Sequence, residues 1–63
     1  MSGKELMRIL EMHGWRLDQI RGSHHVMKKE GYRTISVPVH GNRDLPKGTL
    51  AGILKQAGVI KGE

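Results

Sequence analysis

Arg21-Gly22-Ser23-His24-His25 is the stretch that decides how this chain folds. Gly22-Ser23 is a two-residue turn sequence between two segments typical of strands, residues 15–20 and residues 24–29. A regular strand over residues 15–20 has two faces, one with Trp15, Leu17 and Gln19 and the other with Arg16, Asp18 and Ile20. The stretch therefore predicts a β-hairpin whose second strand begins with two adjacent histidines.

A third strand is predicted over residues 32–39. Apolar side chains alternate there with polar or small ones, and the apolar positions are Ile35, Val37 and Val39. Pro38 has no backbone N–H to donate, so the strand should end there or lie at an edge of the sheet. The short connections between the three segments indicate an antiparallel meander.

Helix signals flank the strands. Ser2 and Glu5 fit a capping box, and an apolar stripe follows at helical spacing, which predicts a first helix over residues 3–13. A second helix should begin near Pro46 and end at Gly58, with an apolar stripe at Leu50, Ile53, Leu54 and Ala57. The predicted fold class is α+β, in the order helix, three-stranded antiparallel sheet, helix, within a single domain over residues 1–63. Both helices should cover one face of the sheet, an architecture like that of double-stranded-RNA-binding domains.

Composition restricts the function further. Eleven Lys and Arg face six Asp and Glu, and the resulting charge of +5 favours polyanionic partners. The chain has no cysteine and its carboxylates are scattered, so we expect no disulfide, no metal site and no cofactor. No apolar stretch reaches the roughly 20 residues of a membrane span. Residues 1–10 lack the apolar run of a secretion signal, so the expected compartment is the cytoplasm.

The two adjacent histidines should point to opposite faces of the sheet, because side chains alternate along a strand. His25 shares its face with Met27, which we expect to lie inward on the helices. His24 then projects from the open face together with Val26 and Lys28. Two side chains on opposite faces cannot both bind one metal ion without distortion.

An exposed histidine among cations suggests RNA chemistry. An imidazole exchanges a proton near neutral pH, and Arg21, Lys28 and Lys47 are the candidate phosphate-binding residues. Taken alone, however, such a histidine is more often an ordinary surface residue than a catalyst. Trp15 could stack on a base, although a lone tryptophan after a helix-ending glycine is more often part of the core. A non-catalytic RNA-binding module, or a protein whose charge only serves docking to an acidic partner, therefore remains open at this point.

Four segments of the chain resemble the HicA toxins, the ribonuclease partners of HicA–HicB toxin–antitoxin pairs. They are His13-Gly14-Trp15, Arg21-Gly22-Ser23-His24-His25, Val37-Pro38-Val39-His40, and Leu45-Pro46-Lys47-Gly48-Thr49-Leu50 running into Ile53-Leu54-Lys55-Gln56-Ala57-Gly58. They cover almost the whole chain in the order and spacing of the family. Two departures are mild, because Met27 stands where an aromatic residue is usual and the link over residues 28–33 is short.

The resemblance implies metal-independent cleavage of mRNA by a histidine and inhibition by a HicB-like antitoxin. The catalytic histidine of the family follows the Gly-Ser turn, which corresponds to His24. Some relatives carry it one place later, so His25 is the alternative, with Ser23 as a possible supporting residue. We expect the free toxin to be a monomer.

Overall fold

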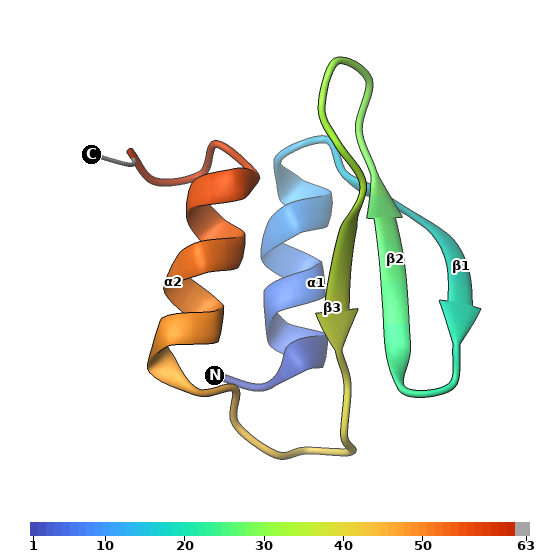
Figure 1. Ribbon diagram of the computed structural model, residues 1–63, viewed down its shortest axis with the longest axis vertical. Coiled ribbons are helices and arrows are strands. Elements are labelled where there is room, and N and C mark those ends of the chain that lie inside the picture. Colours follow the sequence, from blue (N-terminus) through green and yellow to red (C-terminus); the bar gives the residue numbers. More distant parts are fainter. Residues whose placement is uncertain (62–63) are drawn as a thin grey trace.

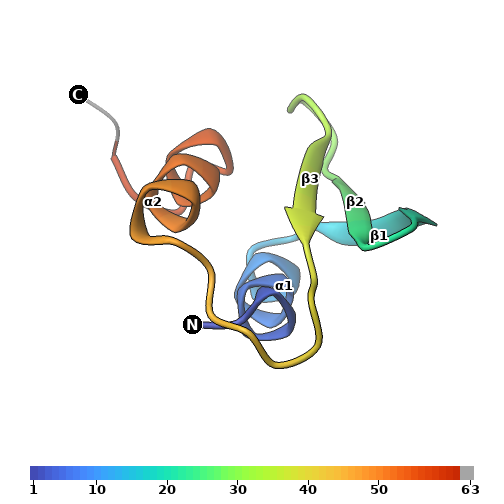
Figure 2. The ribbon, with the colours of Figure 1, turned by 60° about the horizontal axis from the view of Figure 1, so that its bottom comes forward.

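The chain forms α1 (Gly3–Met12), β1 (Arg16–Arg21), β2 (His24–Lys28), β3 (Ile35–Pro38) and α2 (Lys47–Gln56), in the predicted order (Figure 1). This is a computed structural model, and it describes residues 1–61; residues 62 and 63 of the predicted domain lie outside that range. The strands form one antiparallel sheet in the order β1-β2-β3. Both helices pack against β3, and β1 lies on the side of the sheet away from α2 (Figure 2). The predicted α+β fold class is confirmed.

The core fills the space between the two helices and the strands β2 and β3. Its members are Leu6, Leu10, Trp15, Met27, Ile35, Val37, Val39, Leu45, Ile53 and Ala57. Trp15 is 2% exposed, so it belongs to the core rather than to a base-stacking surface. Its ring meets the ring of Tyr32 in an edge contact, with 5.5 Å between the centroids. Within residues 1–61, neither helix has the length and hydropathy that crossing a bilayer requires.

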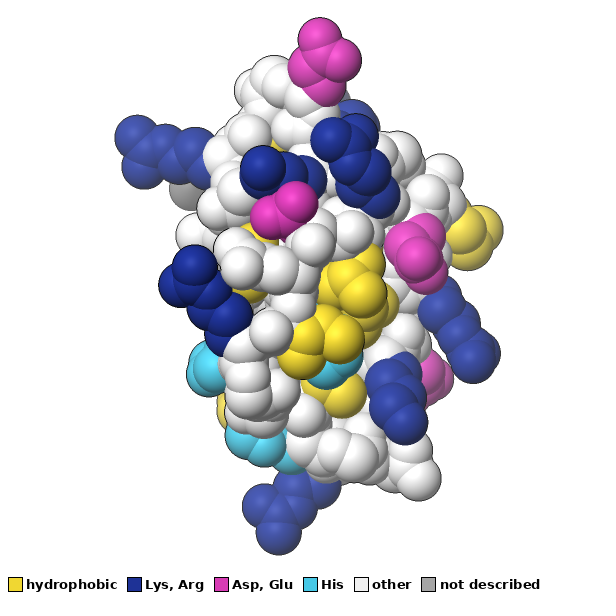
Figure 3. Space-filling view, turned by 90° about the vertical axis from the view of Figure 1, so that its right-hand side faces the viewer, with side chains coloured by type: hydrophobic (Ala, Val, Ile, Leu, Met, Phe, Trp, Pro, Cys, Tyr) yellow, Lys and Arg dark blue, Asp and Glu magenta, His cyan; other side chains and the backbone are white. Residues whose placement is uncertain are grey.

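Strand β1 contributes no buried side chain, because all of its residues are exposed. Figure 3 shows the side of the molecule where β1 lies, and hydrophobic side chains remain visible in the middle of this face. The pairing of β1 with β2 slips between Leu17 and Gln19, which leaves Asp18 as the extra residue of a β-bulge. The bulge corrects the predicted faces, since Ile20 lies on the same side as Leu17 and not on the opposite one.

The hairpin turn is as tight as expected. Gly22 has a φ of +57°, and among residues 1–61 positive φ occurs only at glycines, so Ser23 has a negative φ. Positive φ at the first of two turn residues is the pattern of a type II′ turn, in which glycine avoids a steric cost. The turn places Arg21 directly opposite His24.

Strand β3 is shorter than the predicted segment 32–39. Its first pair with β2 joins Ile35 to Met27, and the preceding residues are not paired with β2. They bend as a turn, in which the N–H of Tyr32 donates to the carbonyl of Lys29 at 3.1 Å. The strand ends at Pro38, at the edge of the sheet, as the missing N–H of proline predicts.

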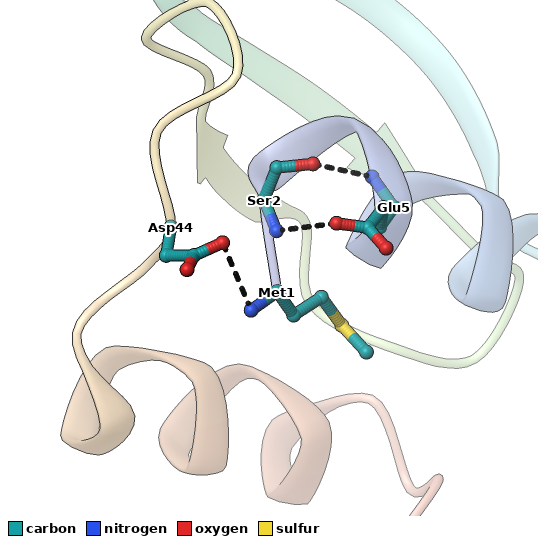
Figure 4. Close-up of polar contacts among 4 residues, drawn as sticks. All are labelled: Met1, Ser2, Glu5 and Asp44. Carbon is teal, nitrogen blue, oxygen red and sulfur yellow. Dashed lines mark hydrogen bonds and ion pairs between the residues drawn. The ribbon is translucent and has the colours of Figure 1, made fainter.

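The predicted capping box begins α1. The Ser2 hydroxyl accepts the N–H of Glu5 at 3.2 Å, and the N–H of Ser2 donates to the Glu5 carboxylate at 3.0 Å (Figure 4). The latter bond is the main reason why the pKa of Glu5 is lowered, because it favours the charged carboxylate. The carbonyl of Met1 accepts the N–H of Leu45 at 2.7 Å, and the amino group of Met1 lies 3.2 Å from Asp44. The start of α1 is thus fastened to the segment that leads into α2.

Gly3 permits the contact between α1 and the end of β3. A Cβ at this position would collide with the carbonyl oxygen of Pro38 and would lie 3.0 Å from a methyl group of Val39. We therefore expect Gly3→Ala to lower the free energy of unfolding by about 1–3 kcal/mol, the usual cost of overpacking. Chemical denaturation of the purified variant measures this change.

The matched control is Gly52→Ala in α2. Among the described residues, no atom outside its own helix backbone and chain neighbours lies within 4 Å of the added Cβ. Alanine favours a helix over glycine by up to about 1 kcal/mol, so this variant should be as stable as the parent or more stable. A Gly3→Ala protein that unfolds at the same denaturant concentration as the parent would refute the close contact.

Candidate functional site

The two histidines at the start of β2 lie on opposite faces of the sheet, as the alternation predicts. His25 is half-buried and shares its face with Met27, which is fully buried against the helices. His24 is exposed on the other face, together with Val26 and Lys28. We call this other face, which carries His24 and the alternate residues of β2 and β3, the open face. His24 is therefore the histidine that a large substrate can reach.

Ser36 holds the imidazole of His24. Its hydroxyl oxygen lies 3.2 Å from Nδ1 of His24, across the pair formed by β2 and β3. With Nδ1 engaged, Nε2 is the ring nitrogen left to face a substrate. If Nδ1 donates to the hydroxyl, a neutral ring has a free lone pair on Nε2 and can act as a base, and the doubly protonated ring carries a proton on Nε2 and can act as an acid. If the hydroxyl donates to Nδ1, the ring is neutral and its Nε2–H can only donate a hydrogen bond.

The serine that hydrogen-bonds to His24 is thus Ser36 and not Ser23 of the turn sequence. Ser23 uses its backbone carbonyl to accept the N–H of Val39 at 2.7 Å, which fastens the hairpin to the end of β3. Within residues 1–61 no hydrogen bond joins the hydroxyl of Ser23 to His24. The sequence did not identify Ser36 as a site residue, because its hydrogen bond to His24 depends on the register between β2 and β3. The available signal was its place among the polar positions that alternate with Ile35 and Val37.

The predicted cations lie at different distances from His24. Arg21 is directly opposite His24, so the two side chains share the open face with Cβ atoms about 5 Å apart. Lys28 is on the same face at the other end of β2, about 13 Å away at roughly 3.3 Å per residue. Its amino group lies 3.8 Å from the carboxylate of Asp18. Lys47 is the first residue of α2, and no hydrogen bond or ion pair of the described part of the chain links it to the other three residues.

Hollows lie near both ends of the open face, and only the one beside Lys28 is clearly basic, because Asp44 accompanies Arg43 in the lining of the other. One of about 350 Å³ is next to Pro38, the residue paired with His24, and His40 and Arg43 line it. Another of about 410 Å³ is lined by Arg16, Lys28 and Lys29 among others. The described part of the chain contains no group of three His, Cys, Asp or Glu side chains that could hold a metal ion. The arrangement suits an extended polyanion that crosses His24.

Comparison with known proteins agrees with this geometry. The sequence model of the family described as "HicA toxin of bacterial toxin-antitoxin" matches residues 3–59. The chain belongs to the HicA toxin family. No curated protein sequence matches it. Among solved structures, a chain of the "Toxin-Antitoxin complex from Streptococcus pneumoniae" is 44% identical, with a TM-score of 0.80 over 92% of this chain and 97% of that one.

Membership of the HicA family confirms the resemblance that the four sequence segments carried, and it makes the chain a toxin of a toxin–antitoxin system. The matched range includes the Gly22-Ser23 turn, both adjacent histidines and the start of α2. In this HicA chain, the turn at Gly22-Ser23 places an exposed imidazole and an arginine next to each other on the open face.

The two histidines should differ in what they contribute to stability. His24 is exposed, so we expect His24→Ala to change the free energy of unfolding by no more than about 0.5 kcal/mol. His25→Ala removes packing from a half-buried position and should lower it by roughly 0.5–3 kcal/mol. Thermal and chemical unfolding of the two purified variants measure the difference.

A third variant identifies the cause of the stability loss in His25→Ala. In the described residues, Nδ1 of His25 is buried without a hydrogen-bond partner, so the loss in His25→Ala is one of packing and not of a hydrogen bond. His25→Leu keeps most of the volume and removes the unpaired nitrogen, and it should be more stable than His25→Ala. Equal stability of His24→Ala and His25→Ala would contradict the assignment of the two faces.

Proposed function

We propose that this HicA toxin is an endoribonuclease that cleaves mRNA, with His24 as its catalytic residue. The observation that carries the proposal is the exposed imidazole of His24, whose Nδ1 is held by Ser36 at 3.2 Å while Nε2 is left open. Arg21 beside it and the basic hollow lined by Arg16, Lys28 and Lys29 add the charge that an RNA backbone requires. Membership of the HicA family supports the same reading.

The chemistry needs no cofactor. The 2′-hydroxyl of the RNA attacks the adjacent phosphorus, the bond to the 5′-oxygen breaks, and a 2′,3′-cyclic phosphate forms. A proton leaves the 2′-hydroxyl and another reaches the 5′-oxygen. An imidazole that performs one of these transfers contributes about 10²–10⁴-fold to the rate. Arg21 lies where its guanidinium can offset the charge that develops on the phosphorane.

The remaining cations bind the strand rather than the reacting phosphate. Lys28 lies at the other end of β2 from His24 and would hold a neighbouring phosphate, and Lys47 at the start of α2 is a further candidate. This binding is electrostatic, so it should weaken as the salt concentration rises. Cleavage itself is proposed to be independent of metal ions, because the chain has no cysteine and its carboxylates are scattered rather than clustered in the part of the chain that the structure describes.

The proposed partner is a HicB-like antitoxin. The neighbour at 44% identity comes from a toxin–antitoxin complex, which supports a partner of the same class here. An unregulated ribonuclease would damage its own cell, so we infer that the antitoxin covers His24 and the cations around it. We further propose that the free toxin is a monomer that acts in the cytoplasm.

Cleavage of a long RNA in excess EDTA tests the enzyme. The parent protein should cut, and His24→Ala should be inactive although it is folded and binds RNA. Ser36→Ala should lower kcat about tenfold, the equivalent of roughly 1.4 kcal/mol for one positioning hydrogen bond, with little change in KM. Ser36→Thr keeps the hydroxyl and should recover most of the loss.

Each alternative reading has its own outcome. Activity that disappears with EDTA and returns with Mg²⁺ would mean a metal mechanism. His25→Ala that is folded and inactive, beside an active His24→Ala, would move the catalyst to His25. RNA binding without cleavage by the parent protein would favour the non-catalytic RNA-binding module.

A stoichiometric complex with the antitoxin should not cleave RNA. The reason is steric, because a partner that covers His24 excludes the substrate from the open face. Cleavage by the free toxin and by the complex, at the same toxin concentration, measures the effect. Undiminished cleavage in the complex would show that the partner leaves His24 accessible.

A further inference from the structure

Strand β1 has no structural task in the core, and this sets it apart from the other elements. Each of its residues is exposed, whereas β2 and β3 bury Met27, Ile35 and Val37. It is also an edge strand, since it pairs with β2 alone among the described residues. Its outer edge therefore carries backbone N–H and C=O groups without a strand partner, which is a template for the addition of another strand.

The helix-facing side of β1 is apolar in spite of its exposure. Leu17 pairs with Met27 and Ile20 pairs with His25, so both side chains point to the side of the sheet opposite His24. They are 41% and 56% exposed, because neither helix reaches over β1. Figure 3, which views the side of the molecule where β1 lies, shows hydrophobic side chains near the middle with Lys and Arg side chains around them. We call Leu17 and Ile20 the β1 apolar patch.

The charges of β1 indicate which partner fits. Arg16 and Arg21 stand at its two ends, and the one acidic residue between them, Asp18, lies 3.8 Å from Lys28. If two copies of the chain paired through β1 in antiparallel fashion, Arg16 of one would face Arg21 of the other, and directly opposed like charges are destabilising. A segment with acidic residues around an apolar centre would instead be attracted to both ends.

The opposite edge of the sheet is less suitable. Strand β3 is only four residues long and ends at Pro38, which has no N–H to donate. Strand β1 is six residues long and contains no proline. An added strand thus gains more backbone hydrogen bonds at β1.

We propose that β1 is a docking site for an extended acidic segment of the antitoxin, which adds to the sheet as a fourth strand. Backbone hydrogen bonds would supply affinity, and the β1 apolar patch with Arg16 and Arg21 would supply specificity. The choice of partner rests on the proposed function, but the β1 apolar patch lies on the side of the sheet opposite His24, while Arg16 and Arg21 point to the open face. The antitoxin would bind the toxin through β1 and exclude RNA from the open face.

The experiment uses the full toxin and the product of the reading frame adjacent to its gene, with affinity measured by calorimetry. Ile20→Glu should weaken binding at least tenfold, since it removes apolar contact and brings a negative charge to an acidic partner. RNA cleavage by the free variant should equal that of the parent. Met12→Glu is the matched control, because Met12 is 83% exposed on α1 and its replacement carries the same charge change. It should bind like the parent.

Amide hydrogen exchange of the unmodified complex provides a second measurement that does not depend on how a variant folds. Exchange should slow over residues 16–21 when the antitoxin binds, because their outward N–H groups become hydrogen-bonded. Unchanged exchange in β1, parental affinity of Ile20→Glu, or the lack of any complex would overturn the proposal. A parent toxin that binds through β1 without cutting RNA would contradict the proposed enzyme and leave the docking site in place.

Discussion

The alternation of side chains along β3 is the constraint on which the rest of the structure depends. On one face of the strand, Ile35 and Val37 are buried beneath both helices. On the other, Ser36 holds the imidazole of His24 at 3.2 Å. A shift of the pairing by one residue would turn Val37 into solvent and Ser36 into the core. The packing of the hydrophobic core and the orientation of the histidine are thus fixed by the same register, which makes a folded but misaligned site improbable on energetic grounds.

Much of the fold followed from local patterns, and the physical reason is that these patterns act over a few residues. The Ser2–Glu5 capping box, the tight turn at Gly22 and the end of β3 at Pro38 each depend on neighbours in the sequence. The opposite faces of His24 and His25 depend only on the alternation within one strand. These features were predicted and the structure contains them.

The features that escaped prediction depend on how strands pair. Ser36 reaches His24 because β2 and β3 align in one particular register, and no local pattern encodes that alignment. The bulge at Asp18 moves Ile20 to the same side as Leu17. Regular alternation along residues 15–20, as predicted from the sequence, therefore places Ile20 on the wrong face. The late start of β3 has the same origin, since residues 32–34 read as strand but are not paired with β2.

Because β1 is exposed, its residues can be substituted at little cost in stability, unlike the residues of the core. Surface substitutions usually alter stability by no more than about 0.5 kcal/mol, so six consecutive positions can drift without threatening the fold. If recognition resides there, related toxins in one cell can acquire different partners while keeping the same fold. After a gene duplication, a few paired substitutions in the toxin and its antitoxin would then stop each antitoxin from inhibiting the other toxin. Every intermediate toxin would still fold.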